Sequence, residues 1–129
     1  MKILVMNSYS PFKGKTGFKR VLHATHYSIS GFRTAFINEA AFRQILLINF
    51  ILIPFSFFLN VSRVEQALMI AVCLLALIVE LFNSAIEAVV DRISLEKHEL
   101  SKNAKDMGSA AQFVALAIIF FTWLIILVP

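Results

Sequence analysis

The chain is poor in charged residues and has almost no cysteine. Only 16% of its 129 residues are charged and 59% are hydrophobic, whereas a soluble domain has about 25% charged residues. The single cysteine, Cys73, excludes an internal disulfide and a multi-cysteine metal site, and its apolar surroundings predict a small packing residue. The composition therefore disfavours a soluble domain and predicts an integral membrane protein.

Basic residues are missing from the C-terminal tail. Eleven of the twelve Lys and Arg lie within residues 2–43 and 92–105, and only Arg63 lies elsewhere. The net charge of +4 could suggest nucleic acid as a partner, but this distribution is typical of positive-inside topology, so we expect no nucleic-acid binding. It predicts that the N-terminus and the 92–109 loop are cytoplasmic and that the C-terminus is periplasmic.

Secretion and lipidation signals are also missing. The first apolar run is too short for a signal peptide, residue 2 is Lys rather than Gly, and no prenylation cysteine follows. We therefore expect the chain to be held in the bilayer by its own helices.

Apolar periodicity predicts an all-α fold with an N-terminal amphipathic surface helix and three transmembrane helices. We expect residues 1–17 to form a flexible basic leader and residues 18–129 to form a single domain. The surface helix covers 18–37 and is expected to be kinked or interrupted at Gly31. Trp123 is expected at the far-side membrane interface. The predicted spans are 44–61, 64–86 and 110–128, with a cytoplasmic loop at 92–109.

The second span continues helically to about Ile93 and carries an acidic stripe. Its predicted length is about 44 Å, more than the hydrocarbon thickness, so its end projects into the cytosol. Polar side chains follow within an arc of roughly 100° of this helix: Glu80, Asn83, Ser84, Glu87 and Asp91. Carboxylates at this depth are costly, so a functional site is the default hypothesis.

The stripe and the Lys105-Asp106 pair suit magnesium-dependent phosphoryl transfer. That reaction needs oxygen ligands for Mg²⁺, a cation for the phosphates and a base for the attacking hydroxyl. Ion translocation or helix pairing could use the same acids. Periodicity and charge alone leave these three uses open.

Three motifs resemble those of the prokaryotic diacylglycerol kinase family. They are NEAAFR at 38–43, ELFNSAIEAVVD at 80–91 and KDMGSAA at 105–111, in the expected order. The resemblance covers about residues 17–128. It implies a three-span lipid kinase of the bacterial inner membrane, active as a homotrimer, that transfers the γ-phosphate of ATP to diacylglycerol and yields phosphatidic acid.

The resemblance also implies roles for particular residues. Glu80 would be the general base, and Glu39 and Glu87 would hold Mg²⁺. The nucleotide would be bound by Arg20, Tyr27, Asn83, Asp91, Glu96, Lys97, His98, Lys105 and Asp106. The lipid substrate would be contacted by Arg20, Ser28, Arg33, Glu80 and Ser109.

Plainer explanations exist for several of these residues. Glu39 could be only a helix cap, and Asn83 only an interhelical hydrogen bond. Arg20 and Lys105 could be headgroup-binding residues. Two functional alternatives are an undecaprenol kinase of the same superfamily and a non-enzymatic protein that uses its acids for ion binding or assembly.

Overall fold

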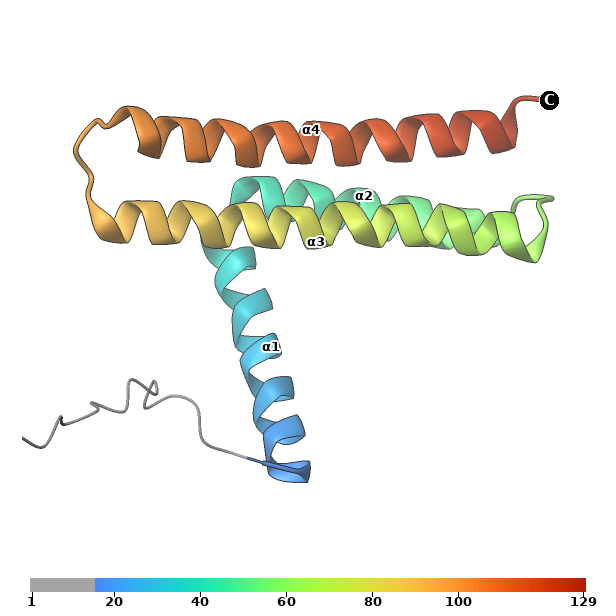
Figure 1. Cartoon of the computed structure of the whole chain (residues 1–129). Helices are drawn as coiled ribbons and strands as arrows, with labels where there is room; N and C mark the ends of the chain where they lie inside the picture. The colour runs from blue at the N-terminus through green and yellow to red at the C-terminus, as the bar shows by residue number, and fades with distance from the viewer. Residues whose placement is uncertain (1–15) are drawn as a thin grey trace, which may run out of the picture. The chain divides into compact units, whose positions relative to one another are not determined.

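The structure, a computed structural model, describes residues 16–129. Four helices account for nearly all of that range, and it contains no strand: α1 (Phe18–Asn38), α2 (Ala40–Ser56), α3 (Arg63–Ile93) and α4 (Glu99–Leu127) (Figure 1). The all-α prediction is confirmed. The predicted leader at 1–17 lies outside the described residues, except for Thr16 and Gly17.

The described residues fall into two compact units, one ending at Arg33 and one running from Thr34 to Pro129. The single domain predicted for 18–129 therefore stays a prediction. Helix α1 has the predicted start, but the predicted interruption at Gly31 is wrong because the helix continues through that residue. A lone glycine in a helix costs only about 1 kcal/mol relative to alanine, which is too little to break it.

Helix α2 begins after Glu39, where the chain leaves α1. The Arg43 guanidinium donates to the carbonyl oxygens of Phe36 (2.8 Å) and Ile37 (3.1 Å), so it satisfies acceptors at the end of α1. The helix ends at Ser56, earlier than the predicted 61. Its last turn tightens, because the amides of Phe57 and Phe58 bond carbonyls only three residues back.

Helix α3 has a sharply defined start. Ser62 and Glu65 form a capping box, in which the Ser62 hydroxyl accepts from the Glu65 amide (3.2 Å) and the Glu65 carboxylate accepts from the Ser62 amide (2.7 Å). The helix runs 31 residues to Ile93, which confirms its predicted end. Its length of about 46 Å exceeds the hydrocarbon thickness, as expected.

The connector between α3 and α4 is shorter than the loop predicted for 92–109. It covers residues 94–98, and α4 begins at Glu99. His98 caps the helix, because its Nδ1 accepts the Leu100 amide at 3.1 Å, and the acidic Glu99 suits the positive helix N-terminus. These local signals extend the helix eleven residues before the apolar segment that begins at Ala110.

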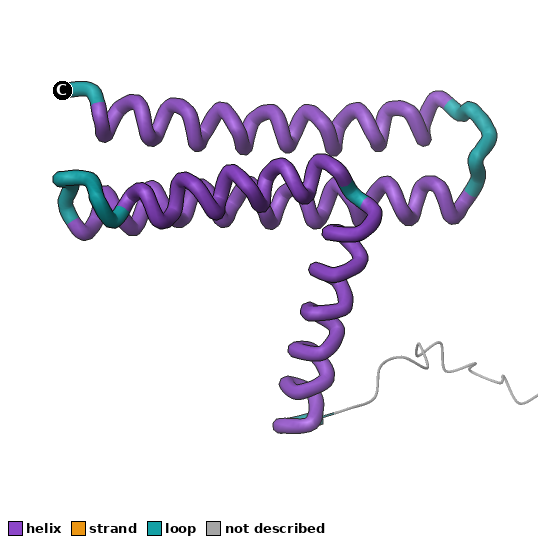
Figure 2. The backbone as a smooth tube through the Cα atoms, turned by 180° about the vertical axis from the view of Figure 1, so that it is seen from behind, coloured by secondary structure: helices purple, strands orange, loops and turns teal. Residues whose placement is uncertain are grey.

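Within the unit from Thr34 onward, α3 packs against both α2 and α4, each antiparallel to it (Figures 1 and 2). Trp123 is buried there, and its predicted place at the far-side membrane interface stays a prediction. Its indole donates to the Met69 carbonyl (3.3 Å) and stacks on Phe55. Cys73 is buried in the core, which confirms the packing prediction. The core comprises Ile45, Met69, Val72, Cys73, Ala76, Ala115, Ile119 and Trp123.

Helices α3 and α4 are each long and apolar enough to cross a membrane. Among the described residues, α1 and α2 meet the same criteria only when taken together as a broken pair. Most large apolar side chains of the bundle face outward, as expected when the surrounding solvent is lipid. The chain is a membrane protein, and whether α2 spans the bilayer stays a prediction.

Candidate functional site

The acidic stripe follows one side of α3 and becomes steadily more exposed toward the end of the helix. Glu80 is only 2% exposed and Asn83 9%. One turn later Glu87 is half-buried, and Asp91 is exposed. The stripe thus connects the interior of the bundle with the polar end of α3.

A third carboxylate joins the stripe from the start of α2. Glu39 occupies the N-cap position of that helix, but its side chain makes no capping hydrogen bond, so a capping role does not explain it. The carboxylates of Glu39 and Glu87 both lie near enough to Glu80 to repel it electrostatically. In residues 16–129 the salt bridges are Lys102–Asp106 and Lys105–Asp91, so none of the three glutamates has a salt-bridge partner there. Such a cluster suits a bound cation.

Close contact between α3 and α4 holds Asn83 beside this cluster. The Asn83 amide nitrogen donates to the Glu87 carboxylate at 3.4 Å, while its Oδ1 is buried without a partner. Gly108 of α4 lies against that oxygen, and a Cβ at residue 108 would overlap it. Sequence reasoning missed this role of Gly108, since nothing in one sequence shows which helix faces which.

Two contacts set the register of α3 against α4. Asn83 lies opposite Gly108, and Met69 lies opposite Trp123, so 14 residues back along α3 match 15 residues forward along α4. Gln112, four residues after Gly108, is therefore at the depth of Glu80. Both polar atoms of its amide are buried without a partner. The sequence analysis did not select Gln112, although a lone amide in an apolar segment was a visible signal.

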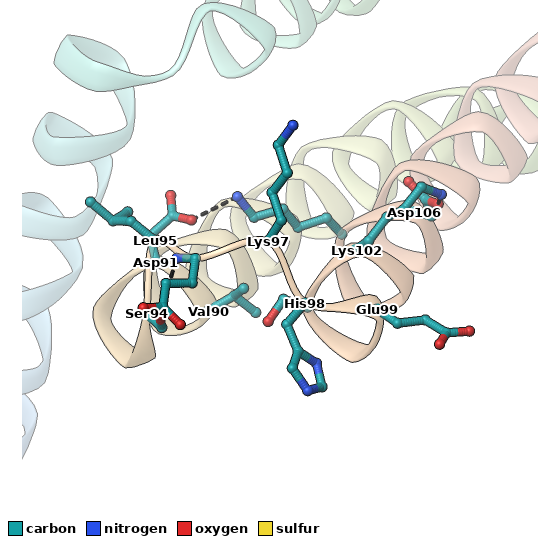
Figure 3. Close-up of a pocket in the computed structure, with 12 residues that line it drawn as sticks. Val90, Asp91, Ser94, Leu95, Lys97, His98, Glu99, Lys102 and Asp106 are labelled. Carbon is teal, nitrogen blue, oxygen red and sulfur yellow. Dashed lines mark hydrogen bonds and ion pairs between the residues drawn. The ribbon is translucent and has the colours of Figure 1, made fainter.

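A pocket of about 900 Å³ lies where α3 ends and α4 begins (Figure 3). Six of the nine residues predicted to bind the nucleotide line it: Asp91, Glu96, Lys97, His98, Lys105 and Asp106. The structure therefore brings together side chains that span 16 residues of sequence. Asn83 does not line the pocket; it lies two turns deeper along α3.

Two exposed ion pairs are formed by residues that line this pocket. Lys105 donates to Asp91 at 2.6 Å, as drawn in Figure 3, and Lys102 pairs with Asp106 one helical turn away. The hydrogen bond to Asp91 raises the pKa of the Lys105 ammonium above its usual 10.5, so Lys105 stays charged at neutral pH. Exposed pairs contribute only about 0–1 kcal/mol, so an incoming phosphate could displace either carboxylate at small cost.

The remaining predicted residues lie elsewhere. Ser109 is exposed on α4, beside Gly108. Arg20, Tyr27, Ser28 and Arg33 are exposed on α1, in the unit that ends at Arg33. The Ser28 hydroxyl donates to its own helix, at the Ala24 carbonyl (2.9 Å), and Tyr27 lies near the rings of His23 and His26. Their roles toward substrate stay predictions.

The carboxylates fit Mg²⁺ only in part. Within residues 16–129, no three His, Cys, Asp or Glu side chains converge closely enough to hold a metal ion on their own. Mg²⁺ commonly takes one or two protein carboxylates and completes its shell with phosphate and water oxygens. Glu39 and Glu87, which both lie near Glu80, match that donor set in kind, as does the unpartnered Oδ1 of Asn83, whose amide nitrogen bonds Glu87.

Comparison with known proteins shows the family of this chain. The chain is 72% identical to a diacylglycerol kinase of Pseudomonas aeruginosa over 93% of this chain and 98% of the relative. It is 49% identical to diacylglycerol kinases of Haemophilus influenzae (84% of this chain, 92% of the relative) and Escherichia coli K12 (87% and 92%). The profile of prokaryotic diacylglycerol kinases matches residues 26–127. The chain therefore belongs to the prokaryotic diacylglycerol kinase family.

Proposed function

We propose that this chain phosphorylates the free hydroxyl of diacylglycerol with ATP, at the membrane surface, and that Glu80 is the general base. The kinase activity and its lipid substrate follow from the family and from three relatives that carry this name over most of their length. The observation that supports the assignment of the base is the position of Glu80, buried at the inner end of a stripe that leads to a polar pocket.

In the proposed reaction the Glu80 carboxylate accepts the proton of the lipid hydroxyl. The oxygen then attacks the γ-phosphorus of ATP, the bond to the β-phosphate oxygen breaks, and ADP leaves. The depth of Glu80 suits a hydroxyl that belongs to a lipid, whereas the pocket residues lie at the aqueous end. Lys105, displaced from Asp91, would pair with a phosphate.

The residues around Glu80 have supporting roles. Glu39 and Glu87 would hold Mg²⁺, which supplies charge neutralisation of the phosphates when bound. The hydrogen bond from Asn83 keeps the Glu87 carboxylate in one orientation. Of the pocket residues, Asp91, Glu96, Lys97, His98 and Asp106 would surround the nucleotide.

The proposed metal ligands can be tested by Mg²⁺ titration of activity. Glu39→Gln and Glu87→Gln remove a charge and leave the shape unchanged, so each variant should need a higher Mg²⁺ concentration for half-maximal rate. Glu65→Gln is the matched control: it lies on α3 but in the capping box, where Gln also serves. An unchanged Mg²⁺ requirement in both site variants would refute the assignment.

We also propose the finer points of location and assembly. The N-terminus and the α3–α4 connector would face the cytoplasm and the C-terminus the periplasm of the inner membrane, as the distribution of basic residues favours. A homotrimer with membrane lipids at its surface would cover the outward apolar side chains of α3 and α4. Mass measurement of the protein in detergent would test the trimer.

A further inference from the structure

Two exposed phenylalanines lie at the turn between α2 and α3. Phe57 and Phe58, directly after the last residue of α2, are 65% and 85% exposed. Two apolar residues later in the same turn point inward instead: Leu59 and Val61 pack against the core cluster. With the capping box of α3 fixing the other end of the turn, the outward direction of both rings is built into the fold.

The turn continues the outward apolar surface of α2. Leu47, Phe50 and Ile51 are exposed on that helix, and no charged residue lies between Arg43 and Arg63. A charge-free segment that is apolar on its outer side is what a lipid environment permits and water does not. The surface therefore reaches without interruption from α2 to the tip of the turn.

The far boundary of the hydrocarbon falls at the level of this turn. From Asp106 to Leu127, α4 extends about 32 Å, close to the hydrocarbon thickness of about 30 Å. The register that pairs Met69 with Trp123 places Leu127 level with Glu65, at the charged start of α3. The end of α4 and the start of α3 lie at the same end of the bundle (Figures 1 and 2).

Helix α2 is too short to reach this boundary unaided. Its 17 residues extend about 25 Å, roughly 5 Å less than the hydrocarbon thickness. The two rings after Ser56 lengthen its apolar surface, and Phe is one of the side chains whose insertion into the membrane is favourable. We propose that Phe57 and Phe58 insert among acyl chains at the far face of the bilayer and anchor the α2–α3 turn, which fixes the depth of α2 and of Glu39 at its other end.

Spin labels at two matched sites test the anchor. Phe58 and Leu95 are apolar, 85% and 87% exposed, and lie in the connectors at opposite ends of α3. Each is replaced by cysteine in a Cys73→Ala background, labelled and reconstituted in phosphatidylcholine–phosphatidylglycerol vesicles. At residue 58, oxygen, which partitions into lipid, should dominate relaxation of the label. At residue 95, a water-soluble nickel chelate should dominate it.

Two results at residue 58 would overturn the proposal. Dominant relaxation by the nickel chelate would place the turn in water. Protection from both reagents would show that protein, such as a second copy of this chain, covers the rings instead of lipid.

A second experiment uses catalysis and rests on the proposed function. Phe57→Ser/Phe58→Ser should match the activity of the wild type in detergent micelles but lose activity several-fold in vesicles. Only a bilayer has a fixed thickness in which the two rings can set the depth of α2. An equal ratio of variant to wild-type activity in micelles and in vesicles would overturn the depth-fixing role. Absence of activity in the wild type would count against the kinase assignment instead.

Discussion

Gly108→Ala should disturb the site without touching any titratable group. The added Cβ would overlap the Asn83 amide oxygen, so either Asn83 rotates away or α4 moves away from α3. Overpacking of this kind costs about 1–3 kcal/mol. The better helix propensity of alanine returns about 1 kcal/mol, so we expect a net loss of stability of about 0–2 kcal/mol.

The effect on catalysis should be larger than the effect on stability. If Asn83 moves, Glu87 loses the hydrogen bond that orients it. A displacement of about 1 Å at a catalytic site can cost about 10²-fold in rate. We therefore expect kcat for phosphate transfer to diacylglycerol to fall by about 10–100-fold, measured beside thermal unfolding of the same sample.

Gly31→Ala is the matched control. Gly31 also lies inside a helix, but a Cβ there meets nothing within 4 Å. It should gain about 0.5–1 kcal/mol of stability and keep its rate. A double variant, Gly108→Ala/Asn83→Ala, should recover stability without recovering activity. If Gly108→Ala alone has wild-type activity, the α3–α4 contact does not position the site.

Three further outcomes follow from contacts in the bundle. Gln112→Leu removes two buried polar atoms without partners and should raise the unfolding free energy by about 1–3 kcal/mol in chemical denaturation; a loss would show that the amide has a partner. Trp123→Phe keeps an aromatic ring but removes the indole hydrogen bond to the Met69 carbonyl and should cost about 0.5–1.5 kcal/mol in the same assay. A double-mutant cycle with Asp91→Asn and Lys105→Met should give only a small coupling, because both side chains are exposed and solvent screens the ion pair. Because the folded-state pKa of Lys105 is raised, its contribution is complete at neutral pH and is lost as the pH rises above 10.5; a coupling that vanishes near neutral pH would contradict the pairing.

Features within one helix could be predicted from the sequence. The period of apolar residues was enough to place α1 and α3, and the acidic stripe on α3 needed only the 100° rotation per residue. The predicted end of α2 and the predicted start of α4 were wrong because they depend on caps and tight turns formed by a few atoms, such as the Phe57 amide and the His98 imidazole.

Features between helices could not be predicted. The closeness of Asn83 to Gly108, the depth shared by Gln112 and Glu80, and the burial of Trp123 all depend on how α3 and α4 face each other. That arrangement is decided by small residues and shape at the contact, which a single sequence does not display. The grouping of Asp91 with Lys105 came from the family resemblance, because periodicity within one helix does not show that the connector reverses the chain after Ile93.

Transfer of label from γ-labelled ATP tests the central claim most directly. Wild type and Glu80→Gln would be compared in mixed micelles with diacylglycerol and, separately, with undecaprenol. We predict label on diacylglycerol that falls by at least about 10²-fold in the variant, as loss of a general base requires. Label that persists in Glu80→Gln would contradict the role of Glu80, label on undecaprenol alone would change the substrate, and no label from folded wild type would contradict the kinase function itself.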